Sequence, residues 1–274
     1  MPAALRRLLG DARHWQIVAL STLLVFNLGW IDFGARAESS ALALGAALIT
    51  QLVCSYLTRT PFDPRSALIT GLSLSLLLRA DAPWIHAVAG AIAIASKFLL
   101  RLDGKHVFNP AGFAIVVLLF AAGSHVWISP GAWGATVWFA TLLVFFAILV
   151  LGAARRADIA LFFLATHAAL LLARAIWLGD PVAIPLHQLQ SGSLLIFAFF
   201  MISDPRTAPD SRLGRFVFAA GVAALAHYLA FFMQMRPALY VALIALAPFI
   251  ILIDRLLPAQ RFVWSRPASQ GAAP

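Results

Sequence analysis

Two short apolar segments decide the architecture of this chain: SALITGLSLSLLL at Ser66–Leu78 and SGSLLIFAFFMIS at Ser191–Ser203. As α-helix, each of these thirteen-residue segments rises only about 20 Å, less than the roughly 30 Å of a bilayer hydrocarbon core. Paired short segments at corresponding positions of two halves are typical of inverted-repeat transporters, with a binding site near the midplane. We therefore predict two half-helices. A simpler interpretation, tilted neighbouring helices with polar ends, stays open.

The composition of the whole chain places these segments in a membrane. Hydrophobic residues make up 62% of the 274 residues and charged residues 11%, with a mean hydropathy of +0.90. A soluble domain carries about 25% charged residues, so too few charges remain here to cover a water-facing surface. The basic residues behind the net charge of +9 stand at the ends of apolar runs, which favours lipid headgroups as partners and excludes nucleic acid. The single cysteine, Cys54, permits no internal disulfide.

Ten apolar runs follow one another along the chain, separated by turn and charge signals. The sequence therefore predicts an all-α membrane protein with about ten transmembrane helices. We expect a basic cytoplasmic N-terminus at 1–14, a transmembrane domain at 15–254 and a cytoplasmic tail at 255–274. The runs lie at 15–32, 40–57, 66–78, 83–100, 110–127, 134–153, 158–178, 191–203, 213–233 and 237–253.

The basic residues predict the orientation of these helices. With ten helices, sixteen of the 20 lysines and arginines fall on one side of the membrane, and four arginines fall on the other. Short cytoplasmic loops carry the excess of Lys and Arg, so both termini should be cytoplasmic, in a bacterial inner membrane. The four arginines expected outside are Arg36, Arg79, Arg174 and Arg236.

An internal repeat is indicated by three matches in the same order. Besides the two short segments, Ala89–Ala95 resembles Ala220–Ala226, and a Pro-Ala pair opens the next helix at Pro110 and at Pro237. Each half, about 15–127 and 134–253, would hold five helices. Because five is odd, the halves must have opposite orientations, which is the inverted-repeat architecture.

Three stretches resemble a known family, the D subunit of Rnf electron-transport complexes and the B subunit of the sodium-translocating NADH:quinone oxidoreductase. The first is Ser66–Leu72 with its Thr-Gly pair, and the second is Gly104–Ala111 with Asn-Pro-Ala, preceded by Lys97. The third and most specific runs from Ser191 to Pro209 through Phe-Phe-Met-Ile-Ser-Asp-Pro-Arg-Thr-Ala-Pro. The resemblance implies a membrane subunit that moves electrons through flavins, coupled to sodium or proton movement, beside other membrane or extracytoplasmic redox subunits.

The chain also departs from this family pattern. The family's extended loop with Ser-Gly-Ala-Thr-Pro-Leu, whose threonine carries FMN, has no counterpart in the short interval from Ala121 to Ser129. Thr136 is the alternative anchor, but Gly131–Thr136 runs directly into an apolar segment and better matches a later part of the family. His106 replaces an asparagine of the family loop. We therefore expect any flavin, FMN or riboflavin, to be bound without covalent linkage.

The resemblance and the residue chemistry together give a set of candidate cofactor-binding residues, with no catalytic residue and no metal ligand. Each has a structural alternative. Asn109 could be a helix N-cap followed by proline, and Gly71 could allow close helix packing. The Lys97 side chain could extend to the membrane interface, and Asp204 could be a helix cap or part of an ion pair. The candidates are Thr70, Gly71, Lys97, Asn109, Ser191, Gly192, Asp204 and Thr207.

Two other functions stay open at this level. His167 and His227 lie within predicted helices and could ligate a haem, although hydrogen-bonded core histidines are the simpler interpretation. A small-solute or ion channel or transporter would use the same inverted repeat without a redox cofactor. A flavin-dependent electron-transport subunit is the interpretation that the family motifs favour.

Overall fold

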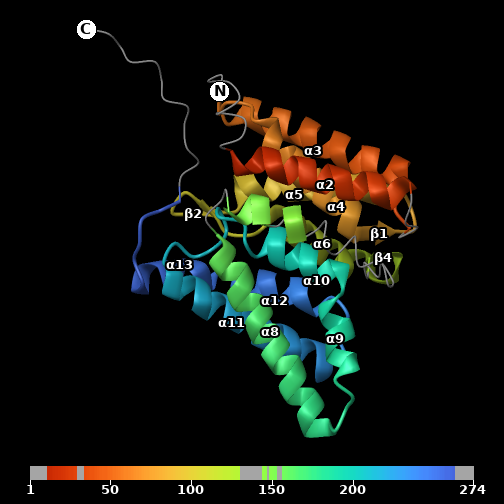
Figure 1. The fold of residues 1–274 in the computed structure, drawn as a ribbon. Helices are drawn as coiled ribbons and strands as arrows, with labels where there is room; N and C mark the ends of the chain where they lie inside the picture. The colour runs from red at the N-terminus through yellow and green to blue at the C-terminus, as the bar shows by residue number, and fades with distance from the viewer. Residues whose placement is uncertain (1–10, 30–33, 130–143, 147, 153–155, 263–274) are drawn as a thin grey trace, which may run out of the picture.

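The computed structural model describes residues 11–29, 34–129, 144–146, 148–152 and 156–262. The predicted first-helix end at 30–32, the Thr136 segment and most of the predicted helix at 134–153 lie outside these residues. Figure 1 shows the helices of the first half as one group and those of the second half as an adjacent group, with α6 between them.

The described part of the first half comprises five helices and two short antiparallel ribbons, β1–β4 and β2–β3. Strand β1 pairs with β4 so that Arg79 lies opposite Trp127. The elements are α2 (Ala12–Gly29), α3 (Ala37–Leu57), α4 (Pro64–Leu77), β1 (Leu78–Ala80), α5 (Trp84–Leu99), β2 (Arg101–Leu102), β3 (Lys105–His106), α6 (Pro110–Ala122), a 3-10 turn η1 (Gly123–His125) and β4 (Val126–Ile128).

The second half combines two long helices, α8 and α11, with several short helical segments. Its described elements are α8 (Ala157–Leu178), α9 (Ala183–Leu189), α10 (Gly192–Ile196), a π-helical turn η2 (Phe197–Met201), α11 (Arg212–Phe231), α12 (Ala238–Leu246) and α13 (Phe249–Leu256).

The all-α membrane fold is confirmed. Helices α3, α8 and α11 are long and apolar enough to cross a bilayer, and two bent pairs pass the same test when each pair is joined. One pair is α9 with α10–η2, bent by 50°, and the other is α12 with α13, bent by 52°. Large apolar side chains such as Trp177 lie exposed on the outer faces, as lipid contact requires. The predicted count of ten is not fixed by the described residues.

The first predicted half-helix appears as α4, which ends in the extended strand β1 instead of crossing further. Asp63 caps its N-terminus by accepting a hydrogen bond from the Arg65 amide, and Pro64 stands at the first helical position. The second half-helix appears as α10 continued by the wider turn η2. Both elements are buried along most of their length.

Two expectations about the second half were incomplete. The sequence did not predict α9, which precedes the break at Gln190–Ser191. The run at 237–253 was expected as one helix, but the structure divides it between α12 and α13 at Ala247–Pro248. Proline lacks the backbone donor that a continuous helix needs, and its ring collides with the preceding turn.

Equivalent helices pack against each other in both halves. In the first half the second and fourth helices, α3 and α5, lie side by side, and in the second half α8 and α11 do the same. A Cβ at Gly90 on α5 would lie 2.6 Å from the carbonyl oxygen of Ala43 on α3, so only glycine allows this approach. The inverted repeat stays a prediction, and this shared pairing supports it.

Candidate functional site

A cavity of about 330 Å³ opens where α2, α4 and α5 meet the loop before α6 and the turn after η2. We call it the Lys97 cavity. It brings together four of the candidate residues with several charged groups from the first half. The lining residues used below are Arg13, Asp63, Thr70, Lys97, Asn109, Asp204 and Arg206.

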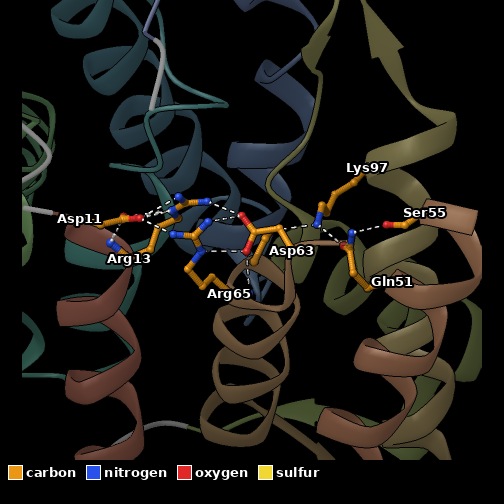
Figure 2. Close-up of polar contacts among 8 residues, drawn as sticks. Asp11, Arg13, Gln51, Ser55, Asp63, Arg65 and Lys97 are labelled. Carbon is orange, nitrogen blue, oxygen red and sulfur yellow. Dashed lines mark hydrogen bonds and ion pairs between the residues drawn. The ribbon is translucent and has the colours of Figure 1, made fainter. Parts of the chain in front are cut away.

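Lys97 is the most unusual group in this cavity, because its ammonium is buried among neutral partners. The side chain is 7% exposed, so it does not extend to solvent at the membrane interface. Its Nζ donates to Gln51 Oε1 at 2.8 Å and to Ser66 Oγ at 2.9 Å, as Figure 2 shows for the link to Gln51. Among the described residues no carboxylate lies within ion-pair distance of Nζ. A buried charge with neutral partners is expensive, which favours a negatively charged ligand.

An ion network closes the cavity on the side of α2. Arg13 binds Asp11 at 2.7 Å and Asp63 at 2.8 Å, and Arg65 binds the same two carboxylates at 2.7 and 2.8 Å (Figure 2). Burial by itself raises the pKa of Asp63, but the hydrogen bonds from Arg65 and the charges of both arginines lower that pKa to about 2. The network joins the start of α2 to the start of α4.

Asp204 follows η2 and brings a carboxylate from the second half into the cavity. Its Oδ1 accepts from the Arg206 amide at 3.0 Å, and its carbonyl accepts from the Thr207 amide at 3.1 Å. Burial raises the pKa of the Asp204 carboxyl, against the opposing effects of the Arg206 amide and charge, the Thr207 side chain and the charge of Lys97. Asp204 therefore shapes its own turn and lines the cavity. The alternative of a helix cap or an ion pair is not what the structure shows, because Ser211 caps α11 and Asp204 forms no ion pair among the described residues.

Asn109 and Thr70 complete the candidate set in the cavity. Asn109 caps α6 by accepting from the Gly112 amide at 3.0 Å, and its Nδ2 donates to the Met201 carbonyl at 3.4 Å. This second bond links α6 to the end of η2. The Thr70 hydroxyl donates to the Ser66 carbonyl at 2.8 Å, one turn earlier in α4.

Four candidate residues do not line the Lys97 cavity. A Cβ at Gly71 would lie 2.8 Å from Leu44 Cδ2, so this glycine lets α4 pack closely on α3. Ser191 and Gly192 stand at the start of α10, at the end of the short helix away from Asp204. Thr207 is buried behind Asp204 and acts on the cavity through that carboxyl.

The sequence did not predict that Gln51, Arg13 and His106 line the cavity. Gln51 is a buried polar residue within the apolar helix α3, and that contrast with its neighbours was a usable signal. Arg13 was assigned only to the topology count. The ring of His106 lies near the Lys97 carbonyl, with Nδ1 at 3.1 Å, and burial together with nearby cations lowers its pKa to about 3. His106 is therefore neutral at physiological pH.

The two helical histidines pack on aromatic rings of their own helices. His167 stacks on Phe163 with ring centroids 5.5 Å apart, and His227 contacts Phe231 at 4.6 Å. No group of three or more potential metal ligands occurs among the described residues.

Comparison with known proteins agrees with the motifs in the cavity. The sequence profile of the NQR2, RnfD, RnfE family matches residues 11–136 and 123–262, nearly the whole described chain. The chain belongs to this family. The Gly104–Ala111 loop and the turn at Asp204–Pro209, which carry family motifs, border the Lys97 cavity of this family member.

Curated relatives are named as the D subunit of an ion-translocating oxidoreductase complex. The protein of Stutzerimonas stutzeri is 29% identical over 78% of this chain and 81% of its own length. That of Alcanivorax borkumensis is 28% identical over 58% of this chain and 64% of its own length. A shorter match to the Erwinia tasmaniensis protein is 30% identical, over 48% of this chain and 40% of the relative.

Proposed function

We propose that this chain is the membrane subunit of an ion-translocating oxidoreductase complex, and that the Lys97 cavity holds a flavin without covalent linkage. The observation that carries the proposal is the convergence of Lys97, Thr70, Asn109 and Asp204, from both halves, on one cavity. Family membership and the function named for the relatives support the assignment to such a complex.

The polarity of the lining suits a flavin, and the cavity has the volume of a small-molecule site. A cavity of about 330 Å³ lies within the range of small-molecule sites, roughly 300–1,000 Å³. Cations outnumber carboxylates along its wall, with Arg13, Lys97, Arg101 and Arg206 against Asp63 and Asp204. This excess suits the phosphate of FMN or negative charge on the ring system.

The flavin would supply the electron transfer, and the protein supplies position and electrostatics. Lys97, fixed by Gln51 and Ser66, offers a positive charge from the wall formed by α5. The Asn109 amide carries both a donor and an acceptor, and its geometry is set by the α6 cap. Asp204, held by its own turn, balances part of the cationic wall.

The proposed lack of a covalent anchor is supported by the sequence. The family's flavinylation loop has no counterpart between Ala121 and Ser129. The alignment with the Stutzerimonas stutzeri protein spans 288 positions, more than the 274 residues of this chain, so that relative carries residues that this chain lacks. We propose further redox subunits in the membrane or outside it as partners, and sodium or protons as the coupling ion.

The decisive measurement is the absorption spectrum of the purified full-length protein in neutral detergent. We expect an absorption band of bound flavin at about 450 nm. Because the flavin is not covalently linked, denaturation should separate it from the protein, and a denaturing gel should show no fluorescent protein band. Lys97→Met should reduce the bound flavin by about tenfold at a fixed flavin concentration, because a charge-assisted contact is lost. Lys105→Met is the matched control, since Lys105 binds Asp254 and Asp210 outside the cavity.

The alternative function, a solute or ion channel or transporter, predicts a different result from the same preparation. It uses the polar wall of α4 in the cavity as a solute site, with hydroxyls such as Thr70 and Ser73. A colourless protein that does not bind added FMN or riboflavin, but moves solute or ions across vesicles, would establish it. A gel band abolished by Thr136→Val would instead show covalent FMN and contradict the proposed non-covalent site.

A further inference from the structure

A second cavity lies at the opposite end of α4 and is not explained by the proposed flavin site. It has a volume of about 420 Å³, and we call it the Arg79 cavity. Its wall comes from the start of α3, the end of α4, strand β1 and the start of α5. The residues on which the inference rests are Arg36, Ser39, Ser40, Ser75, Arg79 and His86.

Arg79 places a permanent positive charge deep in this wall. It is only 5% exposed, and its Nη1 donates to the carbonyls of Ser75 at 2.9 Å and of Leu78 at 2.7 Å. The β1–β4 ribbon holds the Arg79 backbone opposite Trp127, which also lines the cavity. The guanidinium is therefore fixed by main-chain contacts and remains at the cavity wall.

The N-terminus of α3 faces the same space. Its cap residue, Arg36, makes no side-chain cap hydrogen bond, and the buried Ser39 and Ser40 stand in the first turn. The first amides of a 21-residue helix and its dipole attract negative charge. Arg36 adds a cation at the rim.

His86 supplies an independent sign of a ligand. Its ring is 3% exposed and lines the cavity. Within the described part of the chain its Nδ1 has no partner at good hydrogen-bond geometry, with only a weak interaction toward the Pro83 backbone in the preceding turn. The other nitrogen, Nε2, lies 3.3 Å from the Leu78 carbonyl. A buried ring nitrogen without a partner is costly unless a bound group satisfies it.

Two described carboxylates stand in the segments that border this cavity. Asp81 lines the cavity, but its Oδ2 is 2.8 Å from Nδ1 of His125 on the exposed surface. Glu38 is exposed and outside the wall. Moreover, two of the four arginines expected on the extracytoplasmic side, Arg36 and Arg79, meet here, where the positive-inside rule offers no reason for them.

We propose that the Arg79 cavity binds an oxyanion of the phosphate type, either free or as the headgroup of an anionic lipid. Arg79 and the α3 amides would bind the oxygens, with the serine hydroxyls and His86 completing the shell. Trp127, nearly half exposed beside the cavity, suits a site at the membrane interface. The inference does not depend on the flavin, because the two cavities share no lining residue.

The test is thermal unfolding of the purified full-length protein in neutral detergent, with two probes. One is sodium phosphate against sodium chloride at equal ionic strength, and the other is dioleoyl phosphatidylglycerol against dioleoyl phosphatidylcholine. Stabilisation by phosphate identifies a free oxyanion, and stabilisation by phosphatidylglycerol alone identifies a lipid headgroup. If neither probe stabilises the protein, the proposal is wrong.

Variants then locate the effect. Arg36→Gln should weaken the apparent affinity for the active probe by about fivefold, because one cation at the rim is lost while the α3 cap, which does not use its side chain, is kept. Arg236→Gln removes an arginine expected on the same side but outside the cavity, and should leave the affinity unchanged. Arg79→Gln should weaken it further where the variant folds. An equal loss in Arg36→Gln and Arg236→Gln would mean a general surface effect and overturn the site.

Discussion

At the scale of single residues, the Lys97 cavity depends on one buried cation and one carboxylate from different halves of the chain. Lys97 is held by neutral partners on α3 and α4, while Asp204 is held by the amide and side chain that follow it. Lys97 and Asp204 do not form an ion pair with each other in the described structure. A ligand between them would therefore meet a positive wall on one side and a negative one on the other.

Asp204→Asn tests the contribution of that carboxylate. The substitution keeps the size and the acceptor for the Arg206 amide, and burial already disfavours the charged form, so the folded protein should be as stable as wild type or slightly more stable. Ligand affinity should change by roughly ten- to a hundredfold, the effect of one charge-assisted hydrogen bond. The measurement is flavin content together with sodium-dependent thermal stabilisation in detergent. Asp103→Asn, an exposed carboxylate paired with Arg255, is the control.

Normal flavin content, normal stabilisation and normal activity in Asp204→Asn would leave Asp204 as a turn residue alone. The Lys97 cavity would then keep Arg206 as its charged residue from the second half.

Asp63 gives a residue-scale prediction about acid stability. Its pKa is lowered from the usual 3.8 to about 2 by Arg65 and Arg13, so the unfolded chain binds more protons between these values. Stability from this group is therefore fully present above about pH 4 and is lost as the pH falls through 2. Helical content followed by circular dichroism from pH 5 to 2 should show a shallower acid loss in Asp63→Asn than in wild type. Parallel curves would show that the ion network does not stabilise the fold.

At the scale of elements, small residues decide how closely the helices of the first half approach. The internal repeat pairs Gly90 on α5 with Gly221 on α11, but the structure gives the two glycines different surroundings. A Cβ at Gly90 would meet the Ala43 backbone at 2.6 Å, whereas one at Gly221 would meet Leu246 Cδ1 at 3.5 Å, an ordinary contact. The two glycines therefore occupy matching sequence positions, but only Gly90 is needed for close helix packing.

Alanine should destabilise the protein at Gly90 and be tolerated at Gly221. Gly90→Ala should lower the free energy of unfolding by about 1–3 kcal/mol, because α3 and α5 must move apart. Gly221→Ala should leave it unchanged or raise it by up to about 1 kcal/mol through better helix propensity. Titration with sodium dodecyl sulfate in mixed micelles measures both. A loss at Gly221 equal to that at Gly90 would contradict the packing described here.

How far the sequence predicts these elements depends on the kind of signal. Charge, proline and glycine marked most helix ends, and the short segment Ser66–Leu78 was recovered as α4 almost to its residue limits. The break at Pro248 was missed because apolar composition alone does not register the lost backbone donor. Asn109 was correctly expected as a helix cap, but its bond to Met201 joins residues 92 positions apart, which no local pattern reveals.

At the scale of the whole molecule, the two cavities lie at opposite ends of α4, with most charged residues gathered at one end. The Lys97 cavity, the ion network of α2 and α4, and the ion pairs of Lys105 with Asp210 and Asp254 share that end. The β1–β4 ribbon lies at the other end (Figure 1). The Arg79 cavity is lined by residues of that end. The division agrees with the charge split that predicted the topology, since sixteen basic residues were expected inside and four outside.

The orientation itself can be tested with single cysteines at the two ends. Ser124 lies in η1, beside the β1–β4 ribbon, and Ser211 lies at the start of α11, beyond the turn that contains Asp204. In a background with Cys54→Ala, an impermeant maleimide applied to intact cells should label the cysteine at 124 and not the one at 211, because the Lys- and Arg-rich end should remain cytoplasmic. Labelling after permeabilisation shows that both sites are reactive. Labelling at 211 with none at 124 in intact cells would reverse the topology. It would also place the Arg79 cavity on the cytoplasmic side. The positive-inside rule would then account for Arg36 and Arg79, and the proposed oxyanion site would lose one of its supporting observations.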